Sequence, residues 1–107
     1  MDTIPEIDAS TAAARLAAGD TLFVDVRDPR SFAAAHVRGA RHVNDDNLSA
    51  FLDGTERSRP LVVYCYHGHS SLGGAAYFLE QGFEQVWSLT GGFEAWRAQY
   101  PQECSRA

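Results

Sequence analysis

A cysteine stands between an apolar run and a short polar loop, at the point where a helix is expected to begin. Cys65 follows the apolar run 61–64, and the polar residues 66–71 separate it from an amphipathic segment at 72–79. A strand-to-helix turn of this kind directs backbone N–H groups inward and adds the positive end of a helix dipole. Both effects favour the thiolate, which is the form of cysteine that attacks electrophiles. Cys65 is therefore a candidate nucleophile.

The helix dipole alone is too weak to ionise this thiol. A free cysteine with a pKa of about 8.5 is only about 3% thiolate at neutral pH. A helix dipole contributes at most about 2 kcal/mol, which lowers a pKa by about 1.5. We therefore expect direct hydrogen bonds to the sulfur from the N–H groups of residues 66–70, together with the Ser70 hydroxyl.

The same loop supplies candidate substrate-binding groups. Gly68 is expected at a positive φ, because a loop whose amides converge needs such a residue. His67 and His69 either help to hold an anion when protonated or are ordinary exposed imidazoles, and the sequence leaves both readings open. Tyr66 is directed either to solvent or to an acceptor protein.

Two other chemistries are compatible with parts of the loop. Cys65, His67 and His69 are potential zinc ligands, with Cys104 or His36 as a conceivable fourth. A helix N-terminus repels cations, so we expect neither a metal nor another cofactor.

Some phosphatases that have a fold of this kind place an arginine six residues after the cysteine, where it binds phosphate oxygens. That position here is Ser71, and the next arginine along the chain is Arg97. Phosphatase or arsenate reductase activity is therefore not expected.

Composition limits the remaining classes of function. The chain has 107 residues, 45% of them hydrophobic, and its net charge of −5 includes nine scattered arginines and no lysine. We expect one domain over residues 1–107, without affinity for nucleic acid. No apolar stretch reaches the ~20 residues of a membrane span, and the N-terminus does not resemble an export signal. These features favour a cytoplasmic protein, a monomer or weak homodimer, in which Cys104 belongs to an exposed tail.

Short apolar runs alternate with helical segments along the chain. Strands are expected at 4–7, 21–26, 40–43, 61–65 and 85–89. Helices are expected from Asp8 or Ser10 to 18, after Asp28 with Pro29 in first position, and at 47–52, 70–81 and 93–100. The alternation predicts an α/β fold, with a parallel sheet of about five strands and helices on both faces. The loops at 27–28, 65–71 and 90–92 should meet beyond the carboxyl ends of the strands.

Three motifs, in this order, resemble the rhodanese family of sulfurtransferases, and together they span essentially the whole chain. The first is Val-Asp-Val-Arg-Asp at 24–28, followed by Phe32 and by His-Val-Arg-Gly-Ala at 36–40. The second is Cys65 with its six-residue loop, and the third is Leu-Thr-Gly-Gly-Phe-Glu-Ala-Trp at 89–96. The loop resembles that of the single-domain thiosulfate sulfurtransferases of the GlpE type, which usually have asparagine in place of His69.

This resemblance implies a rhodanese-like fold and a two-step sulfur transfer. Cys65 would take the outer sulfur of thiosulfate as a persulfide and pass it to cyanide, to a small thiol or to a dithiol such as thioredoxin. Substrate would be bound by Tyr66, His67, Gly68, His69 and Ser70. The physiological donor stays open, because 3-mercaptopyruvate or a protein persulfide could replace thiosulfate.

A second reading is a sulfur-carrier or redox-sensing module that a protein persulfide loads. An inert interaction domain of the same fold is a third.

Most other matching residues are expected to be structural. Asp25 and Arg27 should form a buried or half-buried ion pair, with Arg27 at the mouth of the pocket as the less favoured alternative. His36 should form a local hydrogen bond, and Phe93 and Trp96 should pack on the sheet.

Overall fold

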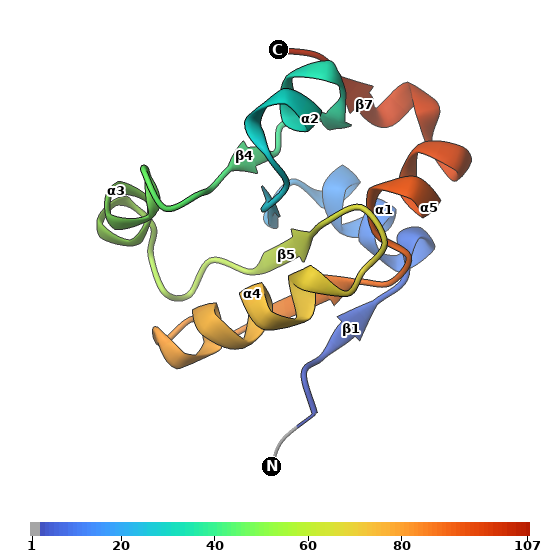
Figure 1. Cartoon of the computed structure of the whole chain (residues 1–107). Helices are drawn as coiled ribbons and strands as arrows, with labels where there is room; N and C mark the ends of the chain where they lie inside the picture. The colour runs from blue at the N-terminus through green and yellow to red at the C-terminus, as the bar shows by residue number, and fades with distance from the viewer. Residues whose placement is uncertain (1–2) are drawn as a thin grey trace.

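The computed structural model describes residues 3–107, which form a central sheet covered by helices on both faces (Figure 1). The elements in chain order are β1 (Glu6–Ile7), α1 (Ala9–Ala18), β2 (Leu22–Asp25), α2 (Pro29–Ala34), β3 (His36–Val37), β4 (Arg41–His42), α3 (Leu48–Gly54), β5 (Leu61–Tyr64), α4 (Ser70–Glu80), β6 (Val86–Leu89), α5 (Gly92–Gln99), the 3₁₀ turn η1 (Pro101–Glu103) and β7 (Cys104–Ser105). All five predicted strands and all five predicted helices are present, with shifted ends.

The main sheet has the order β1-β6-β5-β2-β4, and every neighbouring pair is parallel. This confirms the predicted α/β architecture. β5 is the central strand, and all four of its residues are fully buried, because both faces of the sheet are covered. Its continuous apolar run is the sequence signature of such a strand.

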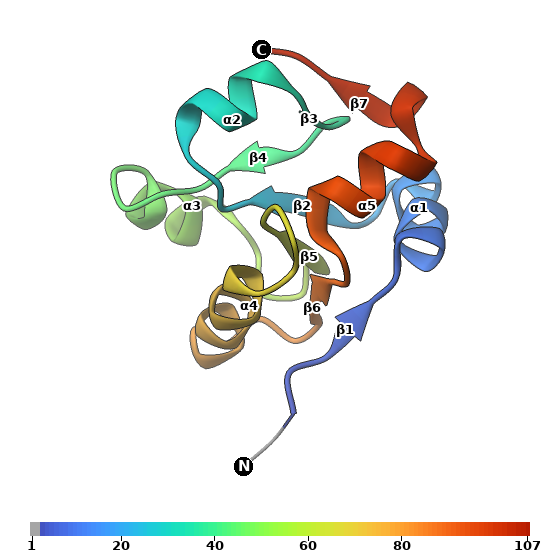
Figure 2. The ribbon, with the colours of Figure 1, turned by 45° about the vertical axis from the view of Figure 1, so that its right-hand side comes forward.

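Alternate residues of β5 belong to two separate cores. Val62 and Tyr64 pack with α1 and α5, whereas Leu61 and Val63 pack with α3 and α4. Figure 2 shows these two helix pairs on opposite sides of the strands. The two-residue period of a strand therefore divides one apolar run between two helical layers.

The helix ends follow the predicted capping residues. Asp8 caps α1 by accepting a hydrogen bond from the Thr11 N–H, and Gly19 ends that helix at a φ of 87°. Asp28 caps α2 in the same way, through the Ser31 N–H, and Pro29 is the first residue of that helix. These caps fix where the loop after β2 leaves the sheet.

The prediction of an exposed tail at Cys104 is wrong. Cys104 and Ser105 form β7, which pairs antiparallel with β3, and the Cys104 side chain is half-buried. The Arg38 N–H donates to the Glu103 carbonyl oxygen at 2.9 Å, and the Arg38 and Glu103 side chains form an ion pair. Strands of two residues lack the apolar periodicity by which a sequence reveals a strand.

Candidate active site

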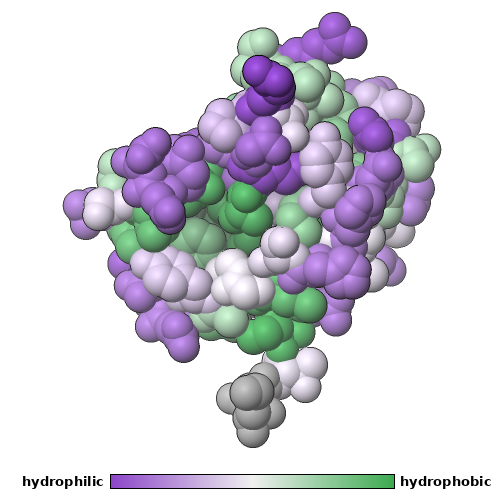
Figure 3. Space-filling model, in the orientation of Figure 1, coloured by the Kyte–Doolittle hydropathy of each residue, from purple (hydrophilic) through white to green (hydrophobic). Residues whose placement is uncertain are grey.

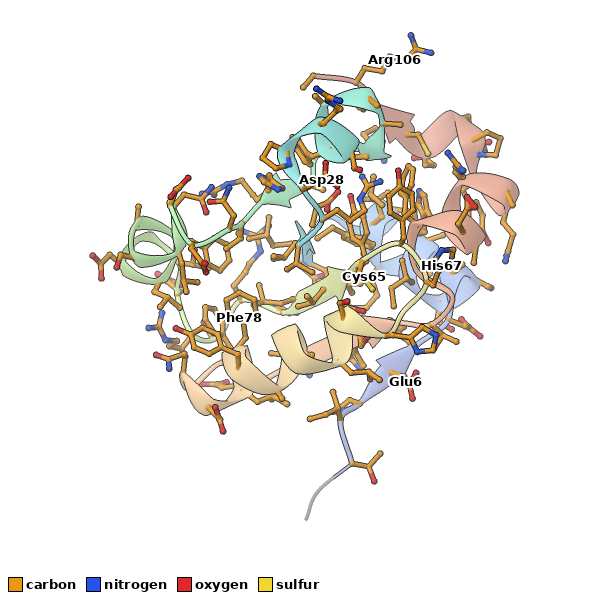
Figure 4. The ribbon with its side chains drawn as sticks, viewed as in Figure 1. Glu6, Asp28, Cys65, His67, Phe78 and Arg106 are labelled. Carbon is orange, nitrogen blue, oxygen red and sulfur yellow. The ribbon has the colours of Figure 1, made fainter. Side chains whose placement is uncertain are left out.

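The Cys65 sulfur lies in a cradle of donors directly after β5. The side chain faces the start of α4 (Figure 4), and the residue is only 7% exposed. Its sulfur accepts hydrogen bonds from the backbone N–H groups of Gly68 at 3.2 Å and Ser71 at 3.3 Å. The Ser71 hydroxyl oxygen is 3.4 Å from the sulfur and 2.8 Å from the Ser88 hydroxyl oxygen. Two amides and a hydroxyl therefore surround the sulfur.

These contacts determine the direction in which the pKa of Cys65 moves. Burial is the largest single influence, and it raises the pKa by penalising the charged form. The Ser71 side chain and the N–H groups of Ser71, Gly68 and His67 lower it, and together they outweigh burial. The pKa of Cys65 is therefore below its ordinary value, and the thiolate is more abundant than in a free cysteine.

The hydroxyl in this cradle belongs to Ser71, and the expectation that Ser70 supplies it is wrong. Ser71 is fully buried and contacts the sulfur through both its N–H and its hydroxyl. Ser70 is the exposed first residue of α4, and its hydroxyl makes no hydrogen bond to Cys65 in residues 3–107. The sequence signal that identifies Ser71 is its place six residues after the cysteine, the position that phosphatases give to arginine.

Three loops meet around this cradle, as the alternation of strands and helices predicts. Gly68 has a φ of 93°, which confirms the prediction made for it, and an added Cβ there would lie 3.0 Å from the Gly91 nitrogen. The Phe93 N–H donates to the Cys65 carbonyl oxygen at 2.8 Å. A Cβ on Gly92 would overlap the backbone of Cys65 and Tyr66, so this crossing requires glycine.

The loop after β2 contributes a buried ion pair between Arg27 and Asp25, also as predicted. Arg27 Nη2 lies 2.7 Å from an Asp25 carboxylate oxygen and donates to the Ala35 carbonyl oxygen at 2.6 Å. Burial lowers the pKa of Arg27, but its hydrogen bond and charge interaction with Asp25 overcome that effect and raise it. The guanidinium therefore stays charged, and it lies over the rings of Tyr66 and Phe93 at 4.7 and 4.3 Å.

An open depression of about 360 Å³ lies beside the Cys65 sulfur. Its lining residues are Val26, Arg27, Asp28, Cys65, Tyr66, His67, His69 and Ser70. Every predicted site residue except Gly68 contributes to this wall, while Gly68 is buried behind it, next to the sulfur.

The two loop histidines are exposed at the rim of the depression, and Tyr66 is half-buried against Phe93. Within residues 3–107, no three side chains of histidine, cysteine, aspartate or glutamate come together as metal ligands would. The hydrogen-bond donors of the cradle all converge on the position of the Cys65 sulfur. This geometry suits a compact, polarisable anion such as a thiolate at that position. The arrangement can support nucleophilic attack by sulfur on a small electrophile that enters from the depression.

Comparison with known proteins agrees with the motifs and the fold. The family model described as "Rhodanese-like domain" matches residues 8–99. Proteins named "Thiosulfate sulfurtransferase GlpE" from two Pseudomonas aeruginosa strains, LESB58 and UCBPP-PA14, are each 46% identical over 104 residues. The match covers 97% of this chain and 94% of each relative.

Solved structures of similar domains superpose closely on this one. The solution structure of the rhodanese-like domain of the Alr3790 protein from Anabaena sp. is 27% identical, with a TM-score of 0.84. The match covers 100% of this chain and 81% of that one. A Rhodopseudomonas palustris protein described as a possible tyrosine phosphatase is 26% identical, with a TM-score of 0.74 and coverage of 90% and 81%.

No helix within residues 3–107 is long and apolar enough to cross a bilayer. The family match spans all three loops that meet at Cys65, and the curated relatives extend it over nearly the whole length. The chain belongs to the family of rhodanese-like domains.

Proposed function

We propose that this protein is a thiosulfate sulfurtransferase that moves sulfane sulfur through a persulfide on Cys65. The names of the Pseudomonas aeruginosa relatives support the reaction class. The decisive observation is the Cys65 sulfur, which accepts two backbone N–H hydrogen bonds and has a lowered pKa. A donor set at one sulfur position stabilises both the thiolate and the terminal anion of a persulfide.

The reaction has two displacements. The Cys65 thiolate attacks the outer sulfur of thiosulfate, the sulfur–sulfur bond of thiosulfate breaks, and sulfite leaves with the bonding electrons. Cyanide then removes the outer sulfur of the persulfide as thiocyanate, and the Cys65 thiolate is restored. A dithiol such as thioredoxin would attack the same sulfur and release it as hydrogen sulfide while forming its own disulfide.

The depression provides the groups that bind the dianionic donor. In this proposal Tyr66, His67, Gly68, His69 and Ser70 surround the substrate, and Arg27 supplies positive charge from the far wall. In residues 3–107, Nη1 of Arg27 is buried without a hydrogen-bond partner, which leaves a donor for a substrate oxygen. The Asp28 carboxylate at the rim accepts two hydrogen bonds from Ser31, which lower its pKa.

We also propose that residues 1–107 act as one domain that works as a monomer or a weak homodimer. Its three loops already converge on Cys65 within one chain, so the proposed chemistry requires no group from a second copy. The radius of gyration of 12.5 Å agrees with the ~13 Å expected for one domain of this length.

The test is the intact mass of the protein after treatment with thiosulfate. We expect a gain of one sulfur atom, lost when cyanide is added and absent in Cys65→Ser. Because Cys104 is the only other cysteine, Cys104→Ser is the matched control and should still gain the sulfur. An unchanged mass in the unmodified protein would contradict the proposal.

The same measurement separates an enzyme from a sulfur carrier. The enzyme gains sulfur from thiosulfate and turns over with cyanide to thiocyanate. A carrier or redox-sensing module would gain sulfur only from another protein's persulfide and would give no thiocyanate from thiosulfate.

A further inference from the structure

An apolar groove lies next to the Cys65 depression, between α3 and α4. Its volume is about 450 Å³, within the range of small-molecule sites. Its lining residues are Val26, Val43, Asn44, Asp45, Leu48, Gly74, Tyr77 and Phe78. Figure 3 shows hydrophobic residues gathered in a hollow on this face, the same face on which Figure 4 places Phe78 and Cys65.

The groove and the depression share a wall. Val26, which follows β2 directly, lines both of them. Gly74 leaves the neighbouring turn of α4 without a side chain, and a Cβ there would lie 3.2 Å from Val63 Cγ1. The helix therefore lies close to the sheet at Gly74, beside Val26, and the groove and the depression adjoin at Val26. A ligand that lies in the groove and extends past Val26 would enter the depression that Cys65 lines.

Neither thiosulfate nor cyanide has an apolar part that this groove could bind. The groove contains half-buried apolar side chains, among them Leu48 and Tyr77, that would gain from contact with hydrocarbon. Its charged lining residue is Asp45. The Asp45 carboxylate disfavours an anionic group inside the groove and leaves uncharged molecules unaffected.

We propose that this groove is a subsite for the sulfur acceptor, and that it binds the hydrocarbon part of an uncharged aliphatic thiol. The proposal rests on the sulfurtransferase function proposed above. The acceptor thiolate attacks the outer sulfur of the Cys65 persulfide, and the sulfur–sulfur bond to Cys65 breaks. Cys65 leaves as the thiolate, and the acceptor departs as an alkyl persulfide. No further oxidant or reductant is required.

The first test compares acceptors of different length and charge at saturating thiosulfate. A fully buried methylene raises affinity about fourfold, and an open groove buries it in part. We expect kcat/KM for mercaptohexanol to exceed that for mercaptoethanol by about tenfold. Mercaptohexanoate has the same number of carbon atoms, with a carboxylate in place of the terminal CH2–OH group. It should lose most of this advantage. Equal values for mercaptohexanol and mercaptoethanol would overturn the proposal, and the groove would then be left to another occupant such as a protein dithiol.

Two leucines on α3 provide a matched pair of variants. Leu48 lines the groove, whereas Leu52 is equally half-buried on the same helix and does not. Leu48→Gln should reduce the preference for mercaptohexanol to less than about threefold, and Leu52→Gln should retain it. Each value is divided by the kcat/KM of the same variant for cyanide, so that a general loss of activity cancels. An unchanged preference in Leu48→Gln would refute the subsite.

A binding measurement keeps this inference separate from the proposed function. Hexanol is titrated into the protein without thiosulfate, and amide chemical shifts are followed by NMR. Shifts concentrated at Val43, Gly74 and Tyr77, and weakened in Leu48→Gln, would support the subsite even if no persulfide formed. Hexanol shifts that are absent or scattered over the surface would overturn it, whereas failure to form a persulfide would overturn only the sulfurtransferase.

Discussion

At the scale of single residues, the environment of Cys65 depends on a buried hydroxyl pair. The Ser71 hydroxyl lies between the Cys65 sulfur and the Ser88 hydroxyl, and both serines are fully buried. Ser88 comes from β6, so a neighbouring strand orients the hydroxyl that faces the sulfur. When Cys65 is a thiolate, Ser71 can donate to it while accepting from Ser88. Among residues 3–107, the groups that hydrogen-bond to the sulfur are two amides and a hydroxyl, none of which carries a charge.

The first prediction concerns Ser71→Ala. This variant removes a hydroxyl that lowers the pKa of Cys65, so the pH midpoint of thiol alkylation should move upward. A hydrogen bond to a charged group contributes about 1.5–3 kcal/mol, and we expect alkylation at neutral pH to slow by about tenfold or more. Stopped-flow reaction with iodoacetamide across a pH series measures both the pH midpoint and the rate of alkylation at neutral pH.

Ser70→Ala is the matched control, because Ser70 is adjacent, exposed and outside the sulfur cradle. Its alkylation profile should coincide with that of the unmodified protein. If the two serine variants shifted the profile equally, the assignment of the hydroxyl to Ser71 would be wrong.

At the scale of elements, the site depends on how closely the loop before α5 crosses the loop after β5. The Phe93 and Glu94 N–H groups donate to the Cys65 and Tyr66 carbonyl oxygens at 2.8 and 3.0 Å. Gly92 permits this crossing, because its φ is 59° and the space for a Cβ is already occupied by backbone. The start of α5 therefore holds the Cys65 loop in place from behind.

The second prediction compares two glycines. Gly92→Ala should destabilise the protein by at least about 2 kcal/mol, because its Cβ meets backbone at a positive φ. Gly73→Ala, at an exposed site in α4 with open space around it, should instead stabilise by about 0.5–1 kcal/mol through helix propensity. Free energies of unfolding in urea measure both. A tolerated Gly92→Ala would show that the crossing is looser than described.

At the scale of the whole molecule, one sheet connects two cores. The core under α1 and α5 and the core under α3 and α4 share strands β2, β5 and β6, whose alternate residues belong to each. The pairing of β7 with β3 also ties the chain after α5 to the segment after α2. Neither core can lose its packing without exposing strands that the other core needs.

The third prediction is a single cooperative unfolding transition. Fluorescence from the buried Trp96 reports on one core, near-ultraviolet circular dichroism includes the Phe51 and Phe78 pair of the other, and far-ultraviolet circular dichroism reports on all helices. The three curves in urea should coincide, with a slope of about 1–2 kcal/mol per molar urea. Separate midpoints would contradict the proposal of one domain over residues 1–107.

Much of the architecture could be predicted from local patterns. The run 61–64, the caps Asp8 and Asp28, and the alternation of apolar and helical segments lead to a parallel α/β sheet with Cys65 at the end of a strand. The positive φ of Gly68 followed from its place in a converging loop. What failed was non-local: β3 and β7 are two residues each, and only their contact with each other makes them strands.

The amino-acid order thus determined which elements form, which residue is the candidate nucleophile and which loops gather around it, because propensity, capping and periodicity act over a few neighbours. Tertiary structure alone decided that Ser71 and not Ser70 faces the sulfur, since the orientation of the first turn of α4 depends on its packing against β5 and β6. It likewise decided that Cys104 is sheltered and that Val26 joins the depression to an apolar groove. Such facts depend on distances between segments far apart in the chain, which no local pattern specifies.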